Sequence, residues 1–216
     1  MSRRKTLFNS SIGRKLVMAL TGFFLITFLT LHLAINLLTL VSAEAFNEAS
    51  HFMGTNPVIQ AMQYVLALGF IFHIGYGIKL TIQNKAARPV GYAYNKPGEN
   101  SGWTSRSMII SGITVLLFLI LHLKDYFVEV KTGNLGGYDT DYEMVVNLFK
   151  NPAYTIIYVV AFIFLGLHLH HGFQSAFQTI GVNHPKYTPF IKKLALAYTY
   201  IVPAGFALIS IYFFLN

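Results

Sequence analysis

The chain has no cysteine among its 216 residues. Without thiols it can form no disulfide, bind no haem through a thiolate and hold no iron–sulfur cluster by cysteine. Charge is also scarce, because Asp, Glu, Lys and Arg make up 11% of the residues, against roughly 25% in an ordinary soluble domain. These absences argue against a soluble domain and leave histidine, methionine and carboxylate as the possible metal-binding side chains.

Long apolar runs take the place of charge, and 54% of the residues are hydrophobic. Five segments approach the ~20 residues that span ~30 Å of hydrocarbon as a helix, at about 16–40, 58–82, 107–127, 153–178 and 194–215. We predict an all-α integral membrane protein with five transmembrane helices, in which residues 1–216 form a single domain. The first segment lacks a small-residue cleavage site, so it is interpreted as a retained span and not a signal peptide.

The formal charge of +8 is sorted by side, which favours membrane topology over nucleic-acid binding as its explanation. One side of the predicted spans carries thirteen of the basic residues: Arg3, Arg4, Lys5, Arg14, Lys15, Lys79, Lys85, Arg88, Lys96, Arg106, Lys186, Lys192 and Lys193. The other side carries the acids Glu44, Glu48, Asp125, Glu129, Asp139, Asp141 and Glu143, balanced only by Lys124, Lys131 and Lys150. The positive-inside rule therefore predicts a cytoplasmic N-terminus and an outer C-terminus.

The connections between the spans differ in character. Residues 41–57 and 128–152 each contain a short amphipathic stretch before an Asn-Pro pair, and we expect short helices at the membrane interface there. The connection at 84–106 is rich in Gly, Pro, Tyr and Asn and contains Trp103, which is typical of an ordered or partner-bound loop at headgroup level.

Each of the first four predicted spans contains a histidine at depth: His32, His73, His122 and His168. An ionisable side chain in hydrocarbon costs a few kcal/mol or more, so such residues usually face the bundle interior with a partner. Imidazole is the commonest metal-binding side chain, and haem iron accepts it as an axial ligand. Four histidines on four spans therefore indicate a shared ligand set.

Two internal correspondences pair these histidines. Residues 21–33, TGFFLITFLTLHL, align without gaps with residues 111–123, SGITVLLFLILHL, and match at the Gly, Phe, Leu and LHL positions. In the second and fourth spans, Gly77 follows His73 and Gly172 follows His168 by four residues, which places each glycine one turn along on the histidine's face. Such gaps suit either a flat macrocycle or an ordinary close helix contact.

Depth pairs the histidines in the same way. Because alternate spans run in opposite directions, His32 and His122 fall toward the outer leaflet, while His73 and His168 fall slightly inward of the midplane, at a level roughly 10 Å away. Facing helices of a four-helix bundle can supply two axial ligands at one level. The sequence therefore predicts two haems b, an outer one bound by His32 and His122 and an inner one bound by His73 and His168.

Other readings of the histidines stay open. A lone transmembrane histidine is more often a packing residue or a proton relay than a haem ligand. His171 lies one turn from His168 on a similar face and is an alternative ligand, whereas His170 points away from it. His51 and His184 fall in connections, where we expect them to be solvated.

Several charged residues near the span ends are candidate partners for haem propionates. At the inner ends these are Arg14, Lys15, Lys79 and Arg106, although such residues more often extend to phosphate headgroups. Lys124 and Asp125 have the same two possibilities at the outer haem or the interface. The sequence predicts no carboxylate inside a span.

The four-histidine pattern, the opening SSIGRKLVMALTGF, the paired LHL motifs and HLHHGFQSAFQTIG resemble one family over nearly the whole chain. It is the diheme cytochrome b anchor of succinate:quinone oxidoreductases, of the single-chain type. The resemblance implies two haems b, a multi-pass protein of the bacterial inner (cytoplasmic) membrane, and docking of an iron–sulfur subunit and a flavoprotein on the cytoplasmic side.

The resemblance also implies the reaction. Electrons from succinate oxidation would reach a membrane quinone, with menaquinone expected, and fumarate reduction would use the same parts in reverse. This chain would contribute haem and quinone chemistry and no dicarboxylate site. In some fumarate reductases of the family a glutamate two residues before the fourth ligand carries protons, but Gly166 stands there in this chain, so that route is not expected. Glu44 or Glu48 is a candidate for quinone protonation, with a solvated interfacial acid as the alternative.

Two rival functions come from other patterns of transmembrane histidine. The first is the cytochrome b anchor of a hydrogenase or formate dehydrogenase, in which the histidines are distributed differently among the helices. The second is a small transporter or channel whose histidines relay protons or bind a metal ion without porphyrin. The co-purifying soluble subunits distinguish the first rival from a succinate:quinone oxidoreductase anchor, and the visible spectrum distinguishes the second.

Overall fold

The computed structural model of the chain describes residues 10–86, 107–182 and 184–216, and all regular structure in them is helical. Five long helices account for most of it: α1 (Ser11–Leu37), α3 (Pro57–Ala86), α6 (Met108–His122), α9 (Pro152–Thr179) and α10 (Thr188–Leu215). α1 continues into the short 3-10 helix η2 (Leu38–Leu40), and α6 continues into η3 (Leu123–Val128) and α7 (Glu129–Thr132). Five helical stretches are long and apolar enough to cross a membrane, which confirms the prediction of five spans.

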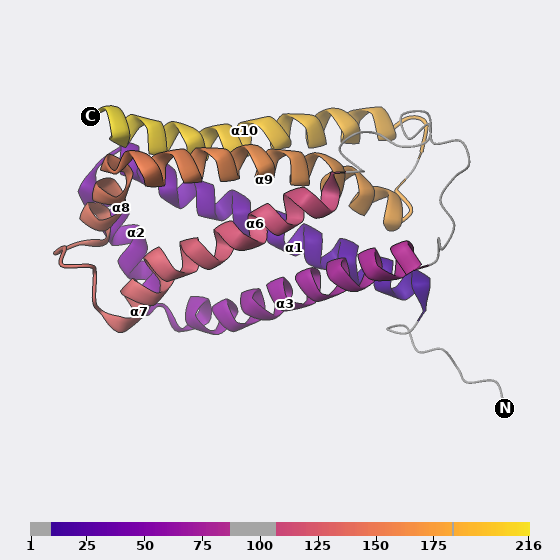
Figure 1. The fold of residues 1–216 in the computed structure, drawn as a ribbon, viewed down its shortest axis with the longest axis horizontal. Helices are drawn as coiled ribbons and strands as arrows, with labels where there is room; N and C mark the ends of the chain where they lie inside the picture. Colours follow the sequence, from indigo (N-terminus) through magenta and orange to yellow (C-terminus); the bar gives the residue numbers. More distant parts are fainter. Residues whose placement is uncertain (1–9, 87–106, 183) are drawn as a thin grey trace.

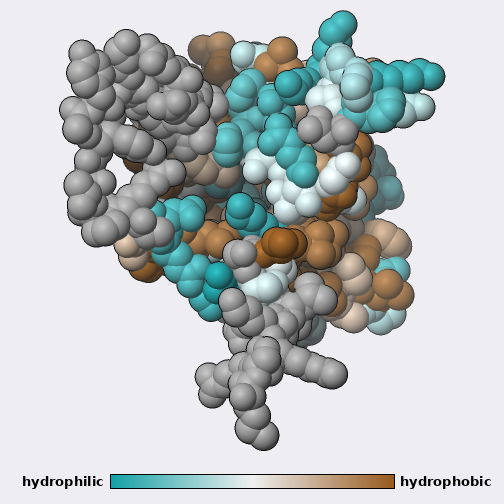
Figure 2. Space-filling view, turned by 90° about the vertical axis from the view of Figure 1, so that its right-hand side faces the viewer, coloured by the Kyte–Doolittle hydropathy of each residue, from teal (hydrophilic) through white to brown (hydrophobic). Residues whose placement is uncertain are grey.

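The long helices lie side by side and alternate in direction along the chain (Figure 1). One end of the bundle, here called the basic end, collects Arg14, Lys15, Lys79, Lys85, Lys186, Lys192 and Lys193 among the described residues. The opposite end, the acidic end, collects the short helices, the C-terminus and the acids Glu44, Glu48, Asp125, Glu129, Asp139, Asp141 and Glu143. Figure 2, which faces the basic end, shows hydrophilic side chains gathered there.

Side-chain caps set where the helices begin. The Ser10 hydroxyl accepts a hydrogen bond from the Gly13 backbone N–H at 2.9 Å and starts α1 several residues before the predicted span. Asn151 caps α9 by accepting from the Ala153 N–H at 3.0 Å, and Pro152 stands in the first turn, where its missing N–H costs nothing. These caps satisfy backbone donors that would otherwise be unpaired at the helix ends.

The connections at 41–57 and 128–152 form the short helices expected from the sequence. α2 (Ala43–Thr55) begins at the Ser42 cap, and α8 (Asp141–Lys150) begins at the Thr140 cap. The two helices meet at the acidic end, where the Tyr142 backbone N–H donates to Asn47 Oδ1 at 3.0 Å. The connection at 84–106 lies almost entirely outside the described residues, so its expected loop is not tested.

The third membrane-spanning stretch contains a feature absent from the sequence analysis. η3 is a π-helical segment, and Asp125 within it is buried, with 9% of its surface exposed. A π-helical turn holds one more residue than an α-helical one and rotates the following side chains, and such turns are frequent at functional sites. The expectation that no span holds a carboxylate is therefore wrong, because the candidate span Met108–Thr132 includes Asp125.

The last long helix, α10, has no histidine; it packs most extensively against α9 and also against α1. The core between these helices includes Tyr158, Phe162, Val202 and Phe206. α9 and α10 approach each other closely at Gly166, because a Cβ added there would lie 3.2 Å from the Thr199 backbone oxygen. Pro203 lies four residues after Thr199 inside α10 and supplies no N–H for that carbonyl, which leaves the oxygen exposed to α9.

Candidate haem-binding site

The structure brings the four transmembrane histidines together as two facing pairs. His32 from α1 and His122 from α6 have ring centroids 5.7 Å apart, with ring planes at 85°. His73 from α3 and His168 from α9 have ring centroids 6.2 Å apart, with ring planes at 74°. The sequence paired the same residues by depth and local motif.

These separations suit one metal ion between each pair. A metal–imidazole nitrogen bond is about 2.0–2.1 Å, so two imidazoles on opposite sides of one ion have ring centres about 6.3 Å apart. In the described part of the chain, no group of three or more His, Cys, Asp or Glu side chains is placed to hold a metal ion. Two nitrogens per site are what an iron porphyrin needs, since the macrocycle supplies the other four ligands.

Glycines of the internal repeat lie against His73 and His168, which are called the inner pair after their predicted depth, as His32 and His122 are called the outer pair. A Cβ added to Gly22 of α1 would lie 3.7 Å from His73 Cε1, and one added to Gly112 of α6 would lie 3.4 Å from His168 Cε1. Each glycine stands ten residues before the outer histidine of its own helix, a rise of about 15 Å. Along α1 and α6, the glycines that touch one histidine pair therefore lie about 15 Å from the histidines of the other pair.

The sequence analysis missed Gly22 and Gly112 as site residues, although the signal was present. Both occupy the glycine position at which residues 21–33 and 111–123 match. At the glycines it did select, an added Cβ would meet methionine: 3.4 Å from Met18 Cε at Gly77 and 3.7 Å from Met108 Cε at Gly172. Because methionine ends are flexible, that space is adaptable.

The inner pair has polar neighbours. Thr21 Oγ1 lies 3.4 Å from His73 Nδ1. His168 Nδ1 is buried and has no hydrogen-bond partner among the described residues. Metal-bound histidines almost always donate their second ring N–H to a nearby acceptor, which fixes the tautomer and the ring orientation.

The outer pair has mainly aromatic neighbours. Phe28 stacks on His32 at 5.3 Å, and Phe118, its equivalent in the repeat, stacks on His122 at 5.6 Å. Phe206 of α10 lies 5.7 Å from the His32 ring. His122 Nδ1 is buried without a partner in the described structure.

The buried Asp125 contacts a tyrosine that in turn contacts His122 of the outer pair. The Tyr158 hydroxyl donates to Asp125 Oδ2 at 3.5 Å, and Lys124 Nζ lies 3.4 Å from Asp125 Oδ1. The Tyr158 and Tyr126 rings lie 6.1 Å and 5.2 Å from the His122 ring. Asp125 thus sits behind two tyrosines and turns inward, rather than lying at an open interface.

The remaining predicted residues take less central places. His171 makes no recorded ring contact with His73, whereas His168 does, and His51 and His184 are exposed. Arg14, Lys15 and Lys79 lie at the basic end, while Arg106 falls outside the described residues. Glu44 and Glu48 are exposed on α2.

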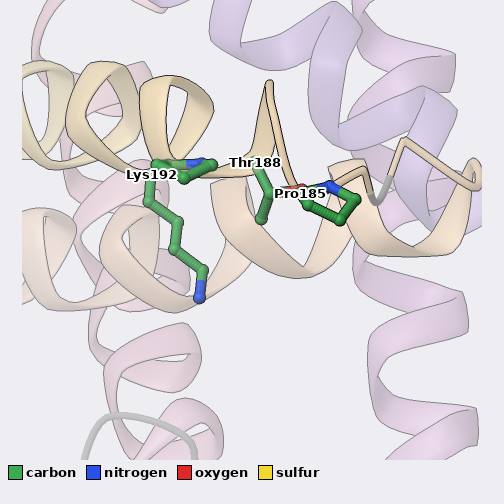
Figure 3. A pocket seen from close by; sticks show the side chains of 4 residues that line it. Pro185, Thr188 and Lys192 are labelled. Carbon is green, nitrogen blue, oxygen red and sulfur yellow. The ribbon is translucent and has the colours of Figure 1, made fainter.

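Two pockets lie at the two ends of the bundle in the described part of the chain. A cavity of about 540 Å³ at the basic end is lined by Pro185, Thr188, Pro189 and Lys192 (Figure 3). A smaller one of about 160 Å³ at the acidic end is lined by Asp125, Glu129, Gly136, Tyr138, Met144 and Leu148. Neither is lined by one of the paired histidines, so the cofactor site is defined by the rings and not by these cavities.

Five candidate membrane spans with two pairs of facing histidines are the arrangement expected of a membrane cytochrome b. The family model described as "Succinate dehydrogenase/Fumarate reductase transmembrane subunit" matches residues 83–204. The chain is also 28% identical over 178 residues to the "Succinate dehydrogenase cytochrome b558 subunit" of Bacillus subtilis (strain 168), covering 81% of each chain. The protein therefore belongs to the succinate dehydrogenase/fumarate reductase transmembrane subunit family.

This membership confirms the resemblance seen in the sequence. The chain is the membrane anchor cytochrome b of an oxidoreductase complex and a multi-pass protein of the bacterial cytoplasmic membrane. No solved structure matches it significantly.

Proposed function

We propose that this anchor holds two haems b, with His32 and His122 as axial ligands of the outer one and His73 and His168 as axial ligands of the inner one. The observation that carries the proposal is the presence of two facing imidazole pairs, with ring centroids 5.7 Å and 6.2 Å apart, on two levels. When bound, the haems supply one-electron transfer through the membrane between an iron–sulfur subunit and a quinone, expected to be menaquinone.

The chain's own residues hold and shield these sites. Neighbouring helices place the members of each imidazole pair, because α1 packs on both α3 and α9, and α6 packs on α9. Gly22 and Gly112 keep side chains away from the inner rings, while Phe28 and Phe118 cover the outer rings with apolar surface. A low-dielectric shell that excludes water controls the redox potential of a bound metal.

The basic end is the proposed cytoplasmic face. Its cations support this orientation by the positive-inside rule, and the same charge suits contact with the iron–sulfur subunit, behind which the flavoprotein holds the dicarboxylate site. We place the N-terminus and the α9–α10 connection on that face.

The acidic end is the proposed quinone side. Quinone reduction consumes two electrons and two protons, so a proton donor must be near the outer haem. The buried Asp125, reached from the 160 Å³ cavity and hydrogen-bonded to Tyr158, is better placed beside His122 than the exposed Glu44 and Glu48. We therefore assign the protons to the Asp125 side of the outer pair and leave Glu44 and Glu48 as solvated interfacial acids.

Purification of the tagged chain with its complex tests the proposal. We expect a reduced visible spectrum of b-type haem, two haems per chain by extraction, and a co-purifying flavoprotein and iron–sulfur subunit. A folded, colourless chain, or one haem per chain, would reject it.

A further inference from the structure

The internal repeat relates more than the histidines of α1 and α6. The alignment of residues 21–33 with 111–123 also pairs Thr21 with Ser111, and at the same spacing one turn earlier Met18 corresponds to Met108. Thr21 precedes Gly22, which faces His73, and Ser111 precedes Gly112, which faces His168. Both inner histidines therefore lie opposite a hydroxyl residue followed by glycine.

On the α1 side the hydroxyl has a hydrogen-bond arrangement that suits a ligand histidine. Thr21 Oγ1 lies 2.9 Å from the Val17 carbonyl oxygen and 3.1 Å from the Met18 carbonyl oxygen, so it donates its proton to its own helix. Its lone pairs then face His73 Nδ1 at 3.4 Å and can only accept. A ring proton on Nδ1 would satisfy this contact and would leave Nε2 free for a metal.

On the α6 side Ser111 has the same contact with its own helix, but its contact with His168 is missing. Ser111 is 1% exposed and donates to the Met108 carbonyl oxygen at 3.0 Å, as Thr21 does to Met18. A Cβ added to the adjacent Gly112 would lie 3.6 Å from His168 Nδ1, which is buried and has no partner among the described residues. A buried ring N–H without an acceptor is unfavourable, so a free lone pair close by is expected to be used.

We propose that Thr21 and Ser111 are matched positioning residues of the inner site, each accepting the Nδ1–H of the histidine that faces it, Thr21 from His73 and Ser111 from His168. The inference rests on the proposed haem ligation. Such acceptors raise the basicity of the ligand nitrogen, which stabilises ferric iron and lowers the reduction potential. His32 and His122 are stacked on phenylalanines and have no serine or threonine hydroxyl bonded to them in the described structure, so the effect belongs to the inner site alone.

The test uses four variants of the tagged, haem-loaded complex, at Ser111, Thr114 and Thr21. Ser111→Ala removes the acceptor, and Ser111→Thr restores a hydroxyl with the residue that α1 already uses. Thr114→Ala is the matched control, because Thr114 also donates to its own helix, at 3.0 Å to the Ile110 oxygen, but has no recorded histidine contact. Haem content, potentiometric titration followed in the visible spectrum, and electron paramagnetic resonance of the two ferric haems are measured for each.

We expect Ser111→Ala to shift the midpoint potential of one haem upward and to change its ferric resonance, while the other haem stays at its wild-type values. Ser111→Thr and Thr114→Ala should match the wild type in both measurements. Thr21→Ala should shift the same haem as Ser111→Ala, since His73 and His168 share it. If Ser111→Ala instead loses that haem, recovery of both haems by Ser111→Thr supports the proposal equally.

Three results would overturn the positioning role: unchanged potentials and resonances in Ser111→Ala, a shift in the haem that His32→Ala removes, or the same defect in Ser111→Thr. A wild-type complex with fewer than two haems would reject the ligand assignment instead, so failures of the two proposals are distinguishable.

Discussion

At the scale of single residues, the two histidine pairs differ in what their rings contact. His73 has a threonine oxygen 3.4 Å from its Nδ1, whereas His32 and His122 are stacked on phenylalanine rings. A ring held by a hydrogen-bond acceptor donates more electron density to a metal than one held by apolar contact. Two sites with the same ligands can therefore have different redox potentials.

The pairing of the histidines gives the first prediction. Because each haem needs both of its axial ligands, His73→Ala and His168→Ala should remove the same haem, and His32→Ala and His122→Ala should remove the other. Each variant should contain about one haem per chain instead of two. Haem extraction combined with redox titration of the purified complex measures both the number and the identity of the haem lost.

A variant containing His171→Ala serves as the control and should keep both haems. If His32→Ala and His73→Ala lost the same component, the pairing by facing rings would be wrong.

The sequence predicted the histidine pairs but only part of their surroundings. Depth and local motifs are readable because helical rise is regular and because a buried imidazole is rare in a membrane span. The contact of Gly22 with His73 is different, since it depends on how α1 and α3 rotate against each other, and no pattern within either helix specifies that rotation. The repeat carried the signal only as a matched glycine with no assigned partner.

At the scale of helices, the bundle is fixed by a few close approaches. Gly166 on α9 faces the Thr199 carbonyl, which Pro203 leaves without an i+4 donor on α10. The sequence identified Gly166 as a departure from a proton-carrying glutamate. The packing adds a physical reason, because a side chain at this position meets backbone and not a movable side chain.

Gly166→Ala should therefore destabilise the packing of α9 on α10. The added Cβ would lie 3.2 Å from the Thr199 backbone oxygen, and overpacking of this kind costs about 1–3 kcal/mol. The measurement is the thermal unfolding midpoint of the purified complex in detergent, which should fall.

Gly75→Ala is the matched control, since a Cβ added to Gly75 has no neighbour within 4 Å and alanine favours helix by up to about 1 kcal/mol. An unfolding midpoint for Gly166→Ala equal to or above that of Gly75→Ala would contradict the contact.

At this scale the sequence pattern did not predict the exact helix boundaries or the π-helical segment. All five spans follow from runs of apolar residues, but α10 begins at Thr188, before the predicted start at 194, because a helix can extend past the hydrocarbon into water. The π-helical segment η3 leaves no mark in hydropathy. Asp125 lies buried within it, whereas the sequence left open whether this residue serves the outer haem or the interface.

At the scale of the whole molecule, the charges separate to the two ends of a bundle whose long sides are apolar. Exposed Leu, Ile, Val and Phe side chains cover the sides, including Leu31, Ile71, Leu117, Ile163 and Ile201. Such a surface is stable only against lipid or a partner of similar polarity. The orientation of the chain across the membrane also belongs to this scale, and it can be tested.

The absence of cysteine makes that direction measurable. Glu44 and Lys193 are exposed at opposite ends, so Glu44→Cys and Lys193→Cys each introduce a single thiol. With the basic end in the cytoplasm, a membrane-impermeant maleimide should label Glu44→Cys in intact cells and Lys193→Cys only after the membrane is opened.

Labelling in detergent is the control that both thiols react when accessible. The reverse pattern in intact cells would place the N-terminus outside.

The uneven contacts of α3 have a consequence for biogenesis. This helix carries His73, yet its main contacts in the described structure are with α1 and the short α2, whereas α9 and α10 pack on each other most extensively. A porphyrin bound by both His73 and His168 would therefore link α3 to α9 and stabilise the position of α3 in the bundle. In cells starved of porphyrin, we expect the newly inserted chain to be cut within or beside its second span by quality-control proteases before it can recruit its soluble partners.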